Sequence, residues 1–375
     1  MPQPEQIQSY RVLLVLLSQT FGGAEVRVLT QARAMQELGH ECHVAVLADS
    51  PLHKRLQIEQ LPYVTVTAGR GDPRLLFQLR QLMQQGDYQI VDAHNVQSIL
   101  WGHDAALVAG VPGRVSTIHS DYGSEYPGLK GRAYEGVLRL NRLMSKQYIT
   151  VTETLQEKAV RQGIGERSTL IHNAVPVPPD PLAQRSNSLR PTWGFTPADF
   201  VVAIIARLKP VKGHTYLLGA LASLPDLPQL KLLVVGDGPL QETLQNQAQA
   251  LRITDRVTFT GFCDNIPEIL QTVDAVCLAS LSEALPYAVL EAASYARPLL
   301  VTKVGGLATL LADGETAVLA APRDPATLAD GLRWLATHPA EAQAMGLAAY
   351  EMVRQSFSVD RMMNQILQVY EKALS

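Results

Sequence analysis

Short apolar runs alternate with amphipathic segments along the first half of the chain. The runs suit buried strands, and most segments between them repeat apolar residues at helical spacing. One such segment, Ala24–Leu38, predicts a helix that ends at Gly39. The predicted strands are Arg11–Leu17, His43–Ala48, Val64–Thr67, Gln89–Ala93, Arg114–His119, Gln147–Thr152 and Thr169–His172. Strands that alternate with helices predict βαβ units and a doubly wound α/β sheet.

The alternation stops over a proline-rich stretch and then resumes. Six prolines between Val175 and Asp199 predict a linker over 179–198. The strands predicted after it are Phe200–Ala206, Leu230–Val235, Val257–Thr260, Ala275–Ala279 and Pro298–Thr302. The helices predicted there are His214–Leu224, Pro239–Leu251, Ile266–Thr272, Tyr287–Ala296, Pro325–Leu335 and a tail, 339–375, that is helical throughout. We therefore expect two Rossmann-like domains, 1–178 and 199–356, with a ligand-binding cleft between them.

Composition narrows the class of protein. The chain has 375 residues, 47% of them hydrophobic, which is enough for two buried cores. A formal net charge of −3 offers no basic field for nucleic acid. Three scattered cysteines form neither a disulfide framework nor a metal-binding pair, which favours a reducing compartment. No signal peptide or membrane span is recognisable, so we expect a cytoplasmic protein that at most lies peripherally on a membrane.

The loop after the strand Phe200–Ala206 carries several cations and leads into a helix. Arg207 and Lys212 are suited to clamp a diphosphate, Arg207 through its planar guanidinium and Lys212 as a point charge. A solvated basic loop is the alternative. After the next strand, Gly236 and Gly238 flank Asp237, a spacing that lets backbone approach a phosphate or a ribose. A tight strand-to-helix turn would explain the same two glycines.

The segment Ser282–Ala293 places two carboxylates on either side of a helix start. Pro286 suits the first helical turn, and the free N–H groups of Tyr287–Val289 would then point at an anion. Glu283 precedes the helix and can reach sugar hydroxyls, while Glu291 can accept hydrogen bonds from ribose hydroxyls. An amphipathic helix with capping acids is the alternative. The ligand-binding residues predicted here are Ala288, Val289, Leu290 and Glu291.

The first domain supplies its own candidates near strand ends. Gly22 and Gly23 follow the first strand and precede a helix, so a ligand could approach their backbone. His119 ends a predicted strand and is a candidate for substrate contact or proton transfer, although most single histidines are structural. His94 has the same two interpretations. Asn173 follows a strand near the linker and would anchor backbone or contact ligand.

The sequence contains no Asp-x-Asp, the pair that commonly holds a metal on a nucleotide diphosphate. Walker, His-Glu-x-x-His and Gly-x-Ser-x-Gly motifs are also absent. A leaving diphosphate would then be stabilised by Arg207, Lys212 and the helix after Pro286 rather than by a metal. We therefore expect no cofactor.

With these motifs together, the chain resembles the GT-B glycosyltransferases of family 4, a retaining group that uses nucleotide sugars. The resemblance covers nearly the whole chain. It rests on Gly22-Gly23-Ala24-Glu25, Asn173-Ala174-Val175, Arg207 with Lys212, Gly236-Asp237-Gly238-Pro239, Glu283 with Glu291, and Gly305-Gly306. Two positions depart from the family pattern: Ala284 stands where glycine is common, and Thr309 stands where glutamate is often found.

The resemblance implies a role for each of these residues. Arg207 and Lys212 would bind the donor diphosphate, Glu291 the ribose, and Glu283 the transferred sugar. His119 matches the family's histidine near the donor sugar, and the loop that ends in Cys263 would lie against the base. Members of the family work without a metal. Their last helix returns to the first, acceptor-binding domain, so Phe357–Ser375 is assigned there.

The implied reaction moves a hexose from a nucleotide sugar to an acceptor hydroxyl of a glycolipid, a polysaccharide or a small glycoside. UDP-sugars are favoured, with GDP-mannose next. Retention would arise by same-face attack, which we favour, or by double displacement. Three alternatives stay open: an epimerase of the same fold, a catalytically silent nucleotide-sugar-binding protein, and a two-domain solute-binding protein, which the missing signal segment disfavours.

One segment of the first domain combines basic and apolar residues. Leu129–Lys146 contains five cations and one acid, with leucines between them. A basic amphipathic helix can lie on anionic lipid. A surface helix that packs its apolar side on the sheet is the alternative.

Overall fold

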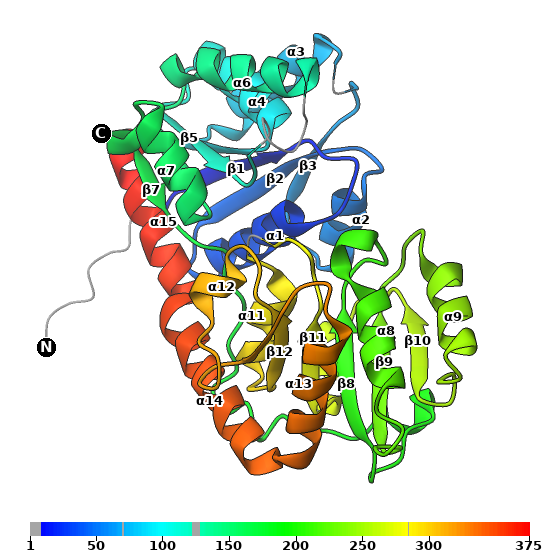
Figure 1. Cartoon of the computed structure of the whole chain (residues 1–375). Helices are drawn as coiled ribbons and strands as arrows, with labels where there is room; N and C mark the ends of the chain where they lie inside the picture. The colour runs from blue at the N-terminus through cyan, green and yellow to red at the C-terminus, as the bar shows by residue number, and fades with distance from the viewer. Residues whose placement is uncertain (1–8, 70, 122–127, 284) are drawn as a thin grey trace, which may run out of the picture. The chain divides into compact units, whose positions relative to one another are not determined.

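The structure is a computed structural model that describes residues 9–69, 71–121, 128–283 and 285–375. It divides into two compact units (Figure 1). The first unit contains residues 1–174 together with 359–375, and the second contains 175–358. Each unit holds one parallel sheet with helices between successive strands, which is the α/β architecture predicted from the hydrophobic pattern.

In the described part of the first unit, seven strands pair in the order β3-β2-β1-β4-β5-β6-β7. The strands are β1 (Arg11–Leu16), β2 (Glu41–Leu47), β3 (Tyr63–Val66), β4 (Ile90–His94), β5 (Gly113–Ile118), β6 (Gln147–Thr150) and β7 (Ser168–Leu170). The helices are α1 (Gly23–Glu37), α2 (Pro51–Ile58), α3 (Arg74–Gly86), α4 (Val96–Ala109), α6 (Leu129–Leu140), α7 (Glu153–Arg161) and α15 (Val359–Leu374). The strand order reverses between β1 and β4.

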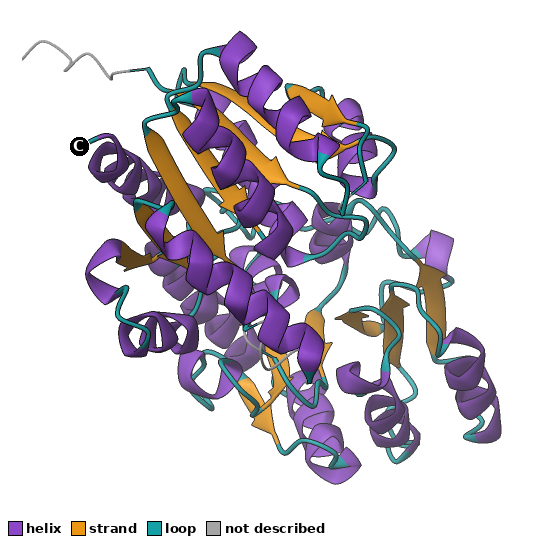
Figure 2. Cartoon of the chain, turned by 90° about the horizontal axis from the view of Figure 1, so that it is seen from above, coloured by secondary structure: helices purple, strands orange, loops and turns teal. Residues whose placement is uncertain are grey.

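Both faces of this sheet are buried, as Figure 2 shows by the helices that flank it. Alternate residues of β1 point to opposite faces: Leu14 packs into the core under α1 and α15, and Val15 into the core under α3 and α4. A strand buried on both faces needs a continuous apolar run, which explains the sequence of β1.

In the described part of the second unit, six parallel strands pair in the order β10-β9-β8-β11-β12-β13. The strands are β8 (Phe200–Ile205), β9 (Leu230–Val235), β10 (Val257–Gly261), β11 (Ala275–Leu278), β12 (Leu299–Thr302) and β13 (Val318–Ala320). The helices are α8 (His214–Ala222), α9 (Gln241–Ala250), α10 (Ile266–Thr272), α11 (Tyr287–Ser294), α12 (Leu307–Leu310), α13 (Pro325–Thr337) and α14 (Pro339–Ser356). Here the strand order reverses between β8 and β11. In such sheets, ligands bind outside the carboxyl ends of the strands at the reversal point.

The sequence predicted a tail that is helical throughout, but the structure divides it into two helices. Helix α14 ends at Ser356 and α15 begins at Val359, because the chain passes from the second unit to the first between them. Phe357 is buried in the core of the second unit, and its carbonyl accepts a hydrogen bond of 3.0 Å from the N–H of Val175. The two passages of the chain between the units are therefore adjacent.

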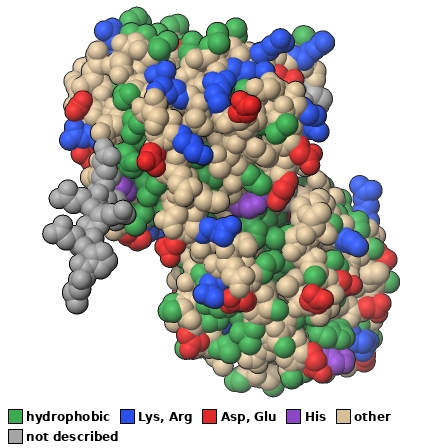
Figure 3. All heavy atoms as spheres, turned by 90° about the vertical axis from the view of Figure 1, so that its left-hand side faces the viewer, with side chains coloured by type: hydrophobic (Ala, Val, Ile, Leu, Met, Phe, Trp, Pro, Cys, Tyr) green, Lys and Arg blue, Asp and Glu red, His purple; other side chains and the backbone are tan. Residues whose placement is uncertain are grey.

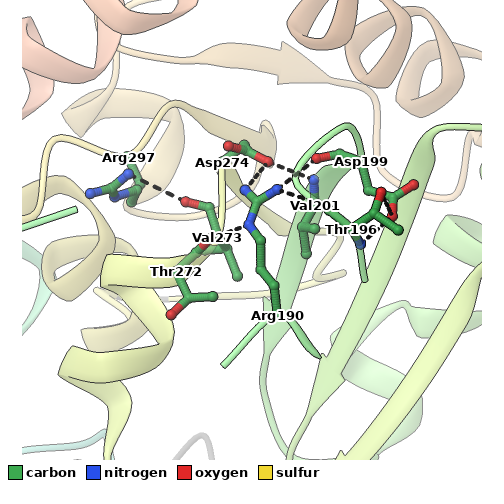
Figure 4. Close-up of polar contacts among 8 residues, drawn as sticks. All are labelled: Arg190, Thr196, Asp199, Val201, Thr272, Val273, Asp274 and Arg297. Carbon is green, nitrogen blue, oxygen red and sulfur yellow. Dashed lines mark hydrogen bonds and ion pairs between the residues drawn. The ribbon is translucent and has the colours of Figure 1, made fainter. Parts of the chain in front are cut away.

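The segment 179–198, expected to be a linker, packs on the second unit (Figure 4). Arg190 is almost fully buried, and its guanidinium donates to the carboxylate of Asp274 at 2.7 Å and to the carbonyl of Asp199 at 2.8 Å. The same Asp274 carboxylate accepts from the N–H of Val201 at 2.8 Å. Arg190 thus ties the proline-rich segment to the first strand of the second sheet and to the start of β11.

Candidate functional site

Two loops meet at the point where the strand order of the second sheet reverses. One follows β8 and carries Lys212, and the other follows β11 and carries Glu283. The Lys212 ammonium and the Glu283 carboxylate form an ion pair, and the hydroxyl of Ser280 donates to the same carboxylate oxygen at 2.6 Å. The Lys212 side chain is 24% exposed and that of Glu283 9%. A positive and a negative group are therefore held together at the edge where a ligand would bind.

Backbone contacts fix these two loops against each other. The N–H of Leu281 donates to the carbonyl of Val211 at 2.7 Å. Gly213 has a φ of +70°, and a Cβ on it would lie 1.8 Å from the carbonyl oxygen of Ala279. Only glycine allows this approach. The ion pair therefore lies between two loops whose backbones are hydrogen-bonded and closely packed against each other.

The glycine pair Gly305-Gly306 supports Glu283 from a third loop. Gly305 has a φ of +48°, and a Cβ there would lie 1.9 Å from the carbonyl oxygen of Glu283. The N–H of Gly306 donates to the same oxygen at 3.2 Å. This pair holds the backbone of Glu283 in place. Thr309, the departure from the family pattern, is exposed, and its hydroxyl donates to the carbonyl of Gly306 at 3.0 Å. Ala284 lies outside the described residues.

Arg207 is exposed on the loop directly after β8. The loop is held by Gly236 and Gly238, where a Cβ would lie 2.2 Å from the carbonyl oxygen of Ala206 and 2.6 Å from that of Leu208. The N–H of Leu208 also donates to the carbonyl of Asp237 at 2.7 Å. Both glycines are therefore required for packing against the Arg207 loop, whether or not their backbone also contacts a ligand.

The start of α11 differs from the sequence prediction. Pro286 is the residue that precedes the helix, not one of its first turn. The N–H of Val289, expected to be free for an anion, donates to the carbonyl of Pro286 at 3.2 Å, as does that of Leu290 at 3.5 Å. Both side chains are fully buried in the core. The expectation of a free amide at Val289 is therefore wrong, and Ala288, one residue earlier, is partly buried.

Glu291 lies one turn into α11 and is partly exposed. Within the described residues, its carboxylate has no hydrogen-bond or ion-pair partner. Burial raises the pKa of the Glu291 carboxyl to about 7. An unpaired carboxylate that remains accessible can accept hydrogen bonds from a ligand's hydroxyl groups, which would favour its ionised form.

Cys263 lies on the loop after β10 and is a free, partly exposed thiol. Its sulfur donates a weak bond of 3.4 Å to the hydroxyl of Thr260. The neighbouring Phe262 is 64% exposed, an unusual position for a large aromatic side chain and one that leaves a flat apolar surface available. Within the described ranges, no three His, Cys, Asp or Glu side chains lie together as a metal site.

In the first unit, Gly22 directly precedes α1 and Gly23 is its first residue. The carboxylate of Glu25 accepts a hydrogen bond of 2.7 Å from the N–H of Gly22, closing the start of the helix. The φ of Gly22 is −166°, which any residue adopts. Glu25, the last residue of the Gly22-Gly23-Ala24-Glu25 motif, thus has a structural role at this helix start.

Two histidines meet at the carboxyl ends of β4 and β5. His119 follows β5 directly, and its Nε2 lies 2.9 Å from Nδ1 of the fully buried His94. Burial lowers the pKa of His94 to about 3 and that of His119 well below its usual value, so both rings are neutral at physiological pH. Asn173 is also nearly buried, and within the described residues its Oδ1 has no hydrogen-bond partner.

A cavity of about 310 Å³ opens at the carboxyl ends of β2 and β3 in the first unit. Its polar lining includes Gln19, Asp49, Ser50 and Thr67. Ser50 caps α2, because its hydroxyl accepts from the N–H of His53 at 3.2 Å. Sequence reasoning did not single out this cavity or Ser280. The only available signal for the cavity was the position of polar residues directly after two predicted strands.

Two family models together match most of the chain. The model described as "Glycosyltransferase Family 4" matches residues 21–177, and the one described as "Glycosyl transferases group 1" matches 186–352. The chain is 30% identical over 325 residues to the glycogen synthase of Mycobacterium tuberculosis, covering 82% of this chain and 74% of that protein. It is 25% identical over 351 residues to the putative glycosyltransferase EpsD of Bacillus subtilis, covering 89% and 90%.

Among solved structures, HepE of Anabaena in complex with UDP is similar in fold, with a TM-score of 0.81 at 23% sequence identity. The match covers 96% of this chain and 99% of that one. The sucrose-phosphate synthase of Thermosynechococcus elongatus is similar at a TM-score of 0.77 and 18% identity. From the matched family models, the full-length relatives and the two parallel sheets, the chain belongs to the family 4 glycosyltransferases of GT-B fold.

Proposed function

We propose that this glycosyltransferase is a retaining, metal-independent hexosyltransferase that uses a UDP-sugar, with GDP-mannose as the second candidate donor. The observation that carries the proposal is the cluster of Lys212, Glu283 and Ser280 at the strand-reversal point of the second sheet, with Arg207 exposed on the same loop as Lys212. The donor would bind here, with its diphosphate on the cations and its sugar against Glu283. Lys212 already balances the charge of the Glu283 carboxylate, and we propose that it also balances the charge of the diphosphate.

The chemistry follows from where charge develops. As the bond between the sugar and the diphosphate breaks, negative charge grows on the leaving phosphate oxygen. Arg207 and Lys212 would stabilise that charge more in the transition state than in the ground state, which is the condition for faster chemistry. Their two positive charges would supply the compensation that a metal provides in other transferases, so the proposed reaction needs no metal.

Glu291 would bind the ribose of the donor. A carboxylate whose pKa is raised to about 7 gains from hydroxyl groups that donate to its ionised form. Two similar proteins favour uridine: the structural neighbour HepE was solved with UDP-glucose, and an Escherichia coli relative, 27% identical over 246 residues, is a galactosyltransferase named for transfer from UDP-Gal. These support the choice of UDP without extending either protein's sugar to this chain.

The acceptor would bind in the first unit, in the cavity of about 310 Å³. The hydroxyl and carboxylate groups of Ser50, Thr67 and Asp49 suit a polyhydroxylated acceptor, such as a sugar or the glycan part of a glycolipid. A hydroxyl of this acceptor would attack the sugar on the face that the diphosphate leaves, giving retention.

A panel of nucleotides tests the donor. The thermal unfolding temperature should rise with UDP and UDP-glucose more than with GDP, GDP-mannose or ADP, because a bound ligand stabilises the folded state by mass action. Transfer should persist in EDTA, and NMR of the product should give an α-linkage from an α-linked donor. An inverted product would reject retention, and a need for a divalent metal would reject metal independence. Turnover of the donor sugar without an acceptor would reject transfer.

We also propose that the first unit contacts anionic lipid through helix α6 and the residues after it. Leu129, Leu140 and Leu143 are 84%, 73% and 94% exposed, and Arg132 and Arg139 are exposed between them. Figure 3 shows hydrophobic side chains mixed with Lys and Arg at the upper end of this unit. The side chain of Lys130 lies outside the described residues, and Arg142 donates to Gln162. No helix in the described residues is long and apolar enough to cross a bilayer.

Liposome co-sedimentation tests this contact. Binding should require anionic lipid and fall in the double variant Leu140→Ser, Leu143→Ser. The matched control is Ile58→Ser, since Ile58 is 72% exposed on α2 of the same unit. Equal binding to neutral and anionic vesicles, or equal loss in the control, would reject the lipid contact.

A further inference from the structure

A chain of polar groups runs from the interior of the first unit to His119. Asp92 and His94 lie two residues apart on β4, and both are fully buried. Nε2 of His94 lies 3.5 Å from Oδ1 of Asp92, and Nδ1 of His94 lies 2.9 Å from Nε2 of His119. The centroids of the two imidazole rings lie 5.2 Å apart, with an angle of 28° between the ring planes. Nε2 of His119 is therefore engaged by protein, whereas within the described ranges no hydrogen bond engages its Nδ1.

Asp92 is held as a hydrogen-bond acceptor. Its carboxylate accepts from the hydroxyl of Thr117 at 2.7 Å, from the hydroxyl of Tyr370 at 2.8 Å, and from the amide nitrogen of Gln31 at 3.2 Å. Burial raises the pKa of Asp92, whereas these three hydrogen bonds and the charge of Arg27 act in the opposite sense. On balance the pKa of Asp92 is raised, yet both of its oxygens accept hydrogen bonds from these three donors.

The oxygen of Asp92 that faces His94 determines which nitrogen of His94 carries the proton. A neutral imidazole has one N–H and one lone pair, and a lone pair directed at an acceptor oxygen is repelled. The proton of His94 therefore belongs on Nε2, toward Asp92, which makes Nδ1 an acceptor. The short contact to His119 then requires His119 to donate from Nε2.

Charges around the pair keep both rings neutral. Burial and the guanidinium of Arg27 lower the pKa of His94 to about 3, and burial, His94 and Arg27 lower the pKa of His119 despite the opposing charge of Asp92. A neutral His119 with its proton on Nε2 has a lone pair on Nδ1. That nitrogen can accept a hydrogen bond but cannot donate one, which excludes a general-acid role in this state.

We propose that Asp92 and His94 are positioning residues that fix His119 as its Nε2-protonated tautomer, so that Nδ1 accepts a hydrogen bond from a hydroxyl of the donor sugar. The sugar-binding half of this statement rests on the proposed function. Residues that act through another group in this way set the orientation and tautomer of a ligand-binding imidazole, as buried carboxylates do elsewhere.

NMR of protein labelled with ¹⁵N-histidine tests the tautomer without any substrate. The chain has nine histidines, and the signal of His119 is assigned by its loss in His119→Gln. We expect a neutral ring protonated on Nε2 at neutral pH. A ring protonated on Nδ1, or on both nitrogens, overturns the proposal, and the wild-type spectrum alone decides this even if every variant below fails to fold.

Two substitutions at His94 separate its acceptor role from its volume. His94→Leu removes the acceptor and should release His119 into a mixture of tautomers. His94→Asn can place an amide oxygen where Nδ1 was and should keep the wild-type tautomer. The matched control is His103→Asn, because His103 is equally buried in this unit but hydrogen-bonds to the carbonyl of Val115 instead. An unchanged His119 tautomer in a folded His94→Leu overturns the proposal.

Deoxy analogues of UDP-glucose test the sugar-binding half. The analogue that lacks the hydroxyl bound by His119 should have a kcat/KM about fivefold to tenfold below that of UDP-glucose in the wild type, which corresponds to the loss of one hydrogen bond. His94→Leu should lose most of that discrimination while His94→Asn retains it. Equal discrimination in wild type and His94→Leu overturns this half. A chain that turns over no nucleotide sugar would refute the proposed function, and with it this half, while NMR still decides the tautomer.

Discussion

The ammonium of Lys212 and the carboxylate of Glu283 form an ion pair at one edge of the second sheet, although 71 residues separate them in the sequence. The pairing depends on Gly213, which lets the Lys212 loop reach the carbonyl of Ala279, and on Gly305, which supports the carbonyl of Glu283. Without a ligand, each charge compensates the other. A bound diphosphate would compete for Lys212 and leave Glu283 available to sugar hydroxyls.

We predict that Lys212→Ala lowers kcat/KM at least about 100-fold, because one preorganised positive charge at the leaving group is lost. Stability should fall by only about 1–2 kcal/mol, since the pair is partly exposed and Ser280 still donates to Glu283. Steady-state kinetics and thermal unfolding measure the two effects. Lys209→Ala is the control, because Lys209 is an exposed cation of the same loop and should retain activity within about twofold. Equal losses of activity in both variants would mean that the total positive charge of the loop, and not Lys212 in particular, determines the rate.

Gly305→Ala should reduce both stability and activity. Its Cβ would lie 1.9 Å from the carbonyl oxygen of Glu283 at a φ of +48°, so the loop must move and carry Glu283 with it. A loss of about 2–4 kcal/mol in the free energy of unfolding is expected. Denaturant unfolding measures it. Gly136→Ala in α6, where a Cβ meets nothing within 4 Å, should be neutral or slightly stabilising. If Gly305→Ala were as stable as wild type, Gly305 would not be the support of Glu283.

Glu291 should make stability depend on pH. Its folded-state pKa, about 7, lies above the ordinary 4.5, so the folded state binds this proton more tightly than the unfolded state. The favourable contribution is complete below about pH 4.5 and is lost as the pH rises to about 7, at a cost on the order of 1–3 kcal/mol. Thermal unfolding of wild type and Glu291→Gln between pH 5 and 8 should diverge in this window, with the variant the more stable at pH 8. Glu242→Gln, at an exposed position of α9, should follow wild type.

The same shift predicts tighter UDP binding as the pH rises through 7, since ribose hydroxyls would bind the ionised Glu291. Calorimetric titration of UDP at several pH values, in wild type and in Glu291→Gln, separates this effect from titration of the phosphate itself. Affinity should fall about tenfold or more in the variant at pH 8 and lose this part of its pH dependence. A pH profile identical in both proteins would remove Glu291 from the binding site.

Tyr370 connects the C-terminal helix to the centre of the first sheet. Its hydroxyl donates to Asp92 and accepts from Gln31 at 2.6 Å, and all three side chains are buried. Tyr370→Phe should cost about 1–3 kcal/mol in the free energy of unfolding, because it leaves Gln31 and Asp92 each short of a partner. In Tyr63→Phe, which removes a contact of 3.3 Å to the exposed Gln57, the change should stay within about 0.5 kcal/mol. Similar losses in both variants would argue against a special role for the Asp92 network.

Much of the fold was predictable because its strands are buried on both faces. The run Arg11–Leu16 is apolar at every position after the first, and this needs no knowledge of what it packs against. The short strand β13, Val318–Ala320, was not predicted, because its three residues carry too little pattern to recognise. The break at Phe357–Ser358 was missed because both flanking segments are helical and the change of unit leaves no proline or glycine there.

The site was predictable where a motif carries its own chemistry and not where a distant contact decides. Lys212 and Glu283 were recognised from residue type and position after a strand, but their pairing depends on loops that only the fold brings together. The prediction of a free amide at Val289 was wrong, because Pro286 precedes α11 and its carbonyl accepts a hydrogen bond from the N–H of Val289. The link from Asp92 through His94 to His119 joins two strands 25 residues apart in sequence, for which one sequence offers no signal.

The most direct test is the release of UDP from UDP-glucose by the purified protein in EDTA, with and without a panel of sugar acceptors. We predict acceptor-dependent release by the wild type and by Lys209→Ala, and a rate at least about 100-fold lower in Lys212→Ala. Release at the same rate in wild type and a folded Lys212→Ala would contradict the claim that Lys212 stabilises the leaving diphosphate.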